Sequence, residues 1–178
     1  LKEAMQFDEF VLWGRSMGAA AALLVQHPLL VDGYKTAYEN DLIINDVDGT
    51  DKQFHIQIFY LEEDNQHVLI ETTVESDIYS IRRFQVTSDT FDQFAQKQPF
   101  KKFKFEDFVD KLTRAFDNVR TNRSSFSAVF TEGDECFLLT IRQQLEFKRV
   151  DIFRLKFTLL DQEQEEYLGR QAQYRYSF

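Results

Sequence analysis

The chain has 178 residues, about the length of one domain, and a formal net charge of −9. Such an acidic chain does not suit a nucleic-acid-binding module, because phosphate contacts require clustered cations. The lone Cys136 excludes an internal disulfide framework and indicates a reducing compartment. No apolar run approaches the ~20 residues that span a bilayer. We therefore expect a cytoplasmic protein that does not enter a membrane.

Residues 1–28 differ from the rest and are predicted to form an N-terminal extension with a strand–turn–helix pattern. The extension contains Gly14-Arg15-Ser16-Met17-Gly18, which matches the G-x-S-x-G nucleophile elbow of α/β-hydrolases. A hydrolase that uses Ser16 would need an acid and then a histidine after further βα units. The downstream histidines leave no room for such units: His27, His55 and His67. A serine hydrolase is therefore an alternative hypothesis and not the leading one.

Residues 29–178 are predicted to form a single domain with a C-terminal tail. Its first part carries four strand-like segments joined by short turns, which indicates an antiparallel meander or barrel: 42–44, 54–61, 68–74 and 78–86. The first turn contains Asp46, Asp48 and Asp51, which resemble part of a calcium loop. Their spacing does not fit an EF-hand, and no glutamate follows at the required distance. We expect a solvated turn and no metal site.

Two helices follow on the 3.6-residue period: a short one that carries Phe91 and Phe94, and a longer one from Phe105 to Val119. Four lysines alternate with phenylalanines between them and are a candidate docking site for an acidic partner such as a tubulin surface: Lys97, Lys101, Lys102 and Lys104. The alternative is a solvated face on a segment whose aromatic side chains are buried.

The last part of the chain returns to strands. A hairpin is predicted from residues 126–130 and 137–145, and an alternating strand follows in which four apolar residues share one face: Phe153, Leu155, Phe157 and Leu159. The whole pattern predicts an α+β fold of about seven mainly antiparallel strands, with a helical insert between strands four and five.

Three ordered blocks resemble a known family. They are Leu69–Tyr79, with the pattern L-x-E-x-T-x-E-S-D-I-Y; residues 86–108, with Phe91, Phe94, Gln98, Phe103 and Phe108; and Ile141–Phe153. Together they resemble the N-terminal head domain of the spindle-assembly-abnormal protein 6 family, closest to its "like" branch, over residues 30–160. Gln144 replaces the usual asparagine, and Phe147 stands where the like branch tends to tyrosine.

The resemblance implies a β-barrel-like head that is a structural, non-catalytic assembly unit of the centriolar cartwheel. It implies no cofactor and no small-molecule substrate. The expected partners are further copies of the chain and microtubule-associated cytoskeletal proteins. The expected location is the cytoskeleton, at a centriole, basal body, cilium or flagellum, or at the conoid found in some parasites.

The resemblance also suggests where copies meet. In cartwheel members, a hydrophobic side chain near the hairpin before the penultimate strand inserts into a pocket on a neighbouring head. The matching region here holds Phe137 and Leu138, so this pair is a candidate for self-association; the alternative is that Phe137 faces the head's own core. Cartwheel proteins also use a coiled coil after the head, but no heptad pattern follows Asp161. A peptide-binding adaptor domain that uses residues 97–104 is a third hypothesis.

Overall fold

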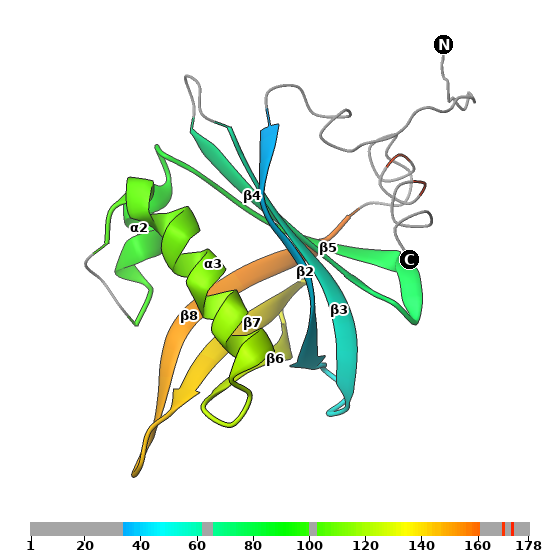
Figure 1. Ribbon diagram of the computed structural model, residues 1–178. Coiled ribbons are helices and arrows are strands. Elements are labelled where there is room, and N and C mark those ends of the chain that lie inside the picture. The colour runs from blue at the N-terminus through cyan, green and yellow to red at the C-terminus, as the bar shows by residue number, and fades with distance from the viewer. Residues whose placement is uncertain (1–33, 62–65, 100–102, 161–168, 170–171, 173–178) are drawn as a thin grey trace. The chain divides into compact units, whose positions relative to one another are not determined.

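A computed structural model describes residues 34–61, 66–99 and 103–160, apart from the side chains of residues 78–79, together with positions 169 and 172 (Figure 1). Residues 36–159 make up one compact unit. The expected extension of residues 1–28, with Ser16, lies outside the described residues, as do Lys101 and Lys102. None of the described helices is long and apolar enough to cross a membrane. A single domain over residues 29–178 stays a prediction.

The described elements follow the predicted order of four strands, two helices and three strands. In chain order they are β2 (Tyr34–Asn45), β3 (Asp51–Leu61), β4 (His67–Val74), β5 (Asp77–Thr87), α2 (Phe91–Gln96), α3 (Phe105–Thr121), β6 (Phe126–Gly133), β7 (Cys136–Gln144) and β8 (Arg149–Leu159).

The strands close on themselves in the order β2-β3-β4-β5-β8-β7-β6. β3, β4 and β5 are antiparallel neighbours, and so are β6, β7 and β8. Among the described residues, few registered pairs join β5 to β8 or β2 to β6, and we call these two places the narrow joints. β5 pairs with β8 through Arg82–Leu159 and Arg83–Thr158, and β2 pairs with β6 through the single parallel pair Asn45–Val129.

Arg82 ties the two joints together. It lies on β5 at the β5–β8 joint, and it donates a hydrogen bond to Asp46 Oδ1 at 2.9 Å, directly after the β2–β6 joint. Its guanidinium carbon lies 4.6 Å from the ring centre of Phe130 and 4.1 Å from that of Phe137. Burial would raise the pKa of Asp46, but hydrogen bonds from Arg82 and Lys52 hold this pKa below its usual value.

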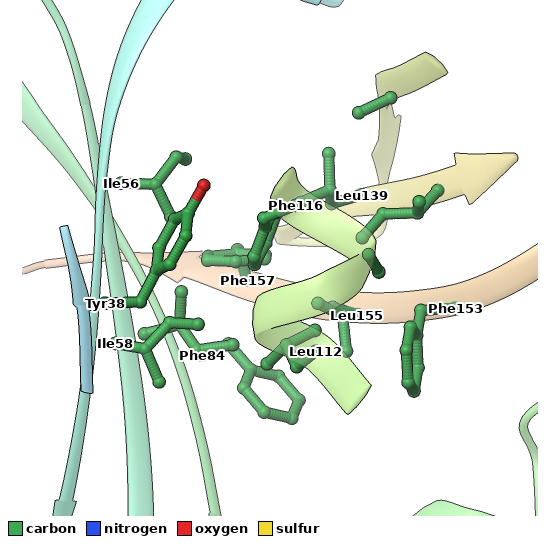
Figure 2. Close-up of a cluster of buried hydrophobic side chains, with 14 of the residues drawn as sticks. Tyr38, Ile56, Ile58, Phe84, Leu112, Phe116, Leu139, Phe153, Leu155 and Phe157 are labelled. Atoms are coloured by element: carbon green, nitrogen blue, oxygen red, sulfur yellow. The ribbon is translucent and has the colours of Figure 1, made fainter. Parts of the chain in front are cut away.

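α3 packs its apolar face against both sets of strands. Its buried residues are Phe108, Leu112, Ala115, Phe116 and Val119. Figure 2 shows side chains from α3, β2, β3 and β8 meeting in one cluster. Tyr38 of β2 stacks on Phe116 with ring centres 6.0 Å apart, and its hydroxyl donates to Asp117 Oδ1 at 3.3 Å. Burial, followed by the negative charge of Asp117, raises the pKa of Tyr38 to about 12.

Gln98, in the segment between α2 and α3, bonds to the backbone of β8. Its Nε2 donates to the carbonyl of Arg154 at 2.9 Å, and its Oε1 accepts from the amide of Arg154 at 2.8 Å. Arg154 pairs with Thr140 of β7 on the other side of the strand. The side chain, 3% exposed, therefore takes the place of a neighbouring strand at this point.

Two details differ from the sequence pattern. β2 begins at Tyr34, well before the predicted segment 42–44, because Tyr38 adds a buried side chain beside α3. Leu159 shares its parity with Phe153, Leu155 and Phe157 but is 49% exposed, whereas the other three are buried. Leu159 is the last residue of β8 and lies at the narrow joint, beyond the core that buries the other three.

Candidate self-association surface

The hairpin between β7 and β8 has a turn fixed by its own hydrogen bonds. The amide of Leu145 donates to the carbonyl of Lys148 at 2.8 Å, and Gln144 Nε2 donates to the carbonyl of Leu145 at 2.9 Å. The backbone N–H of Gln144 also donates to the carbonyl of Ser125 at 2.7 Å. This bond anchors the base of the hairpin just after α3. The turn residues 145–148 thus have a defined backbone.

Phe147 lies in this turn with 90% of its surface exposed. Leu145, two residues before it, is 39% exposed. Many of the described phenylalanines pack in the core in ring–ring contacts, for example Phe84 with Phe157 and Phe91 with Phe108. A large aromatic side chain held in water on an ordered turn is unusual for a packed domain and is typical of an interaction anchor.

Phe137 and Leu138, the predicted pair, lie at the start of β7 and are both half-buried. The Phe137 ring faces Arg82 and packs against the chain's own core. Leu138 pairs with Thr131 of β6 and Lys156 of β8. A role for these two residues in self-association stays a prediction, and Phe147 is far more exposed than either.

The two described lysines of the predicted docking segment flank Gln98. Lys97 caps the C-terminal end of α2, and Lys104 precedes the first residue of α3; both are exposed. Phe103 and Phe105 beside them pack against the core. The segment thus combines partly buried aromatics with exposed lysines, and its use as a docking site stays a prediction.

The remaining sequence candidates have structural partners. His55 on β3 has Nδ1 2.7 Å from Asp41 Oδ1 and Nε2 2.9 Å from Glu39 Oε2, both on β2. In the aspartate-rich turn, Thr50 donates two hydrogen bonds to Asp48 Oδ1, which lower the pKa of Asp48 to about 2. Within the described ranges, no group of three His, Cys, Asp or Glu residues is arranged to hold a metal ion.

Residues 39–157 match the family described as "Centriolar protein SAS N-terminal domain". The chain belongs to this family. The match runs from within β2 to within β8 and therefore includes the β2–β6 joint, the helical insert and the β7–β8 hairpin. No curated protein matches the chain.

Solved SAS-6 head domains share the fold. An N-terminal fragment of Leishmania SAS-6 that contains part of its coiled coil is 15% identical with a TM-score of 0.69, covering 82% of this chain and 90% of that one. An N-terminal fragment of Drosophila melanogaster Sas-6 is 13% identical with a TM-score of 0.67, covering 91% and 76%. The N-terminal domain of C. elegans SAS-6 is 8% identical with a TM-score of 0.63, covering 73% and 100%.

The TM-scores establish the fold of a SAS-6 head, and the family match makes the chain a structural domain of a centriolar protein family. The resemblance found in the sequence is confirmed at the level of the family. Its assignment to the like branch stays a prediction. Sequence reasoning noticed Phe147 only as a departure from the family pattern; an aromatic residue between Glu146 and Lys148, in the loop between two strands, was the available signal of an exposed anchor.

Proposed function

We propose that this head is a non-catalytic assembly unit of a microtubule-based structure and that two copies associate through the β7–β8 hairpin, with Phe147 as the anchor. The observation that supports this proposal is that Phe147 is 90% exposed on a hydrogen-bonded turn. Fully burying a phenylalanine side chain contributes about 1.5–3 kcal/mol. One anchor therefore supports a weak contact, which becomes effective when copies are already held close together.

Two relatives support an anchor of this kind. The Drosophila fragment is a phenylalanine-to-aspartate variant described as dimerised via its coiled-coil domain, and one Leishmania fragment is a phenylalanine-to-glutamate variant. In both, a phenylalanine of the SAS-6 fragment has been replaced by an acidic residue. By analogy, a charge at position 147 is the sharpest perturbation of the proposed contact.

Sedimentation velocity at increasing protein concentration tests the anchor. We expect the unmodified chain to show a concentration-dependent rise in sedimentation coefficient, and Phe147→Asp to weaken the association at least about tenfold, which corresponds to ~1.4 kcal/mol. Thermal unfolding of Phe147→Asp should match the unmodified chain, because so exposed a side chain contributes little to the core.

Two further variants give the experiment its control and its alternative. Leu159→Asp charges another exposed apolar residue, outside the hairpin, and should leave the association unchanged. Leu138→Asp tests the other predicted contact while it leaves the Arg82–Phe137 pair in place. If Leu138→Asp dissociates the copies and Phe147→Asp does not, the β6–β7 hairpin is the contact and Phe147 is not the anchor.

We also propose that the head docks onto microtubule-associated partners through Lys97 and Lys104, with Lys101 and Lys102 between them in the sequence, at a centriole, basal body, flagellum or conoid. Exposure of the two described lysines supports this proposal. Co-sedimentation with microtubules should be lost when the four lysines are changed to glutamine and should weaken as salt is raised. Salt-insensitive binding, or none, would count against it.

A further inference from the structure

A groove runs between the first turns of α3 and the strands β2, β3 and β4. Its volume is about 570 Å³, within the range typical of small-molecule sites. We call it the α3 groove. Its apolar lining is Ala37, Tyr60, Leu61, Val68, Phe105 and Val109. Ala37, Tyr60, Phe105 and Val109 pack against the core yet are only partly buried, so the groove presents apolar surface to solvent.

The rim of the α3 groove is acidic. Glu106 and Asp110 lie four residues apart on α3, and the described residues that line the cavity include no lysine or arginine. Asp110 pairs with Arg114 at 2.5 Å on the exposed face of the helix. Glu106 is exposed in the first turn of α3, and its carboxylate has no side-chain partner among the described residues. An apolar floor beside an exposed carboxylate is complementary to an apolar side chain next to a cation.

The α3 groove is separate from the self-association hairpin. The groove involves residues 105–113 of α3, whereas the base of the hairpin bonds to Ser125, beyond the end of the helix. A helix as long as α3, with 17 residues, spans ~25 Å at 1.5 Å per residue. The two surfaces therefore lie toward opposite ends of α3, and one can be changed without the other.

We propose that the α3 groove is a docking site for a partner protein segment in which a bulky apolar side chain adjoins a lysine or arginine. The apolar side chain enters between Tyr60 and Val109, and the cation pairs with Glu106. The same acidic rim disfavours acidic segments, so the groove and the lysine segment of residues 97–104 select partners of opposite charge.

Fluorescence anisotropy with the 178-residue chain tests this proposal. The probe is a labelled synthetic peptide with one phenylalanine flanked by two lysines in a glycine–serine background; the matched peptide has glutamates in place of the lysines. We expect only the lysine peptide to bind, and its affinity to fall as salt rises. Glu106→Lys and Val109→Glu should each weaken binding about tenfold or more. Asp107→Lys is the control, because Asp107 is exposed in the same turn but does not line the groove, and it should change the affinity less than twofold.

Three outcomes would overturn the proposal. The first is no binding of the lysine peptide. The second is equal weakening by Asp107→Lys and Glu106→Lys, which would mean general charge attraction to an acidic protein. The third is displacement of the probe by a peptide that copies residues 144–149, together with loss of self-association in Glu106→Lys. That result would mean that the groove receives a second copy of this chain.

Discussion

Replacing Gln98 by alanine tests whether one side chain substitutes for a missing strand beside β8. The change removes two hydrogen bonds, of 2.9 and 2.8 Å, to the backbone of Arg154. It leaves the amide and carbonyl of Arg154 without these partners at a site where Gln98 is 3% exposed. An unsatisfied buried polar group costs about 1–3 kcal/mol. Since some water can enter the space that alanine leaves, we expect a total loss of about 2–4 kcal/mol in the free energy of unfolding.

Urea unfolding followed by circular dichroism measures this loss, and hydrogen exchange localises it. For a chain of this size, 1 kcal/mol shifts the melting temperature by about 2–4 °C. The amide of Arg154 should exchange faster in Gln98→Ala. Gln96→Ala is the matched control, because Gln96 is exposed at the end of α2, and it should stay within about 0.5 kcal/mol of the unmodified chain. The reasoning fails if the two variants are equally stable and the Arg154 amide keeps its protection.

Further predictions concern the buried polar groups. Arg82→Met leaves the buried Asp46 with Lys52 as its remaining cationic partner. The free energy of unfolding measured in urea should fall by about 3 kcal/mol, and an equally stable variant would contradict the role of the ion pair. The folded-state pKa of Asp46 is lowered, so its contribution is present above the usual value of 3.8 and is lost as pH falls through the folded pKa. As pH is lowered, the melting temperature should therefore fall less in Asp46→Asn than in the unmodified chain. Parallel curves of melting temperature against pH in the two proteins would refute this. Ultraviolet titration should find a phenol that ionises near pH 12 in the unmodified chain, and this ionisation should be lost in Tyr38→Phe.

The order of the helices and strands was predictable because turn residues and the spacing of apolar residues are signals within short stretches of sequence. The helix at 105–119 was found from its apolar spacing, and the structure places α3 at Phe105–Thr121. The β4–β5 turn was found from its polar residues. These features depend on neighbours in sequence, which a single chain displays directly.

The joints could not be predicted in the same way. Asn45 and Val129 are distant in sequence, and nothing in either segment indicates that they pair in parallel. The period-two pattern also failed in β3, where residues 54–59 are all buried and both faces of the strand are covered. The sequence there does alternate, but its polar residues His55 and Gln57 are also buried, and both lie within hydrogen-bonding distance of Glu39 on β2.

The self-association site shows both the strength and the weakness of pattern reasoning. The family resemblance predicted a contact near the β6–β7 hairpin, with Phe137 at the start of β7 as a candidate. The alternation along β7 instead points Phe137 toward the core, because Phe137 shares a strand face with Leu139 and Ile141, which are fully buried. Phe147 lies outside the alternation, in a loop, where no core position is available to it.

The narrow joints have a consequence for the order of folding. β3–β5 and β6–β8 are each built from hairpins between strands adjacent in sequence, so each set has low contact order and is expected to form early. Closing the barrel then brings together the three registered pairs of the joints, the Arg82–Asp46 bridge and the core contacts between the two sets, such as Phe84 with Phe157. Interactions that form after the transition state mainly control unfolding rates. We therefore expect changes at Arg82 to accelerate unfolding and leave the folding rate nearly unaltered, so the barrel's lifetime is set at its joints.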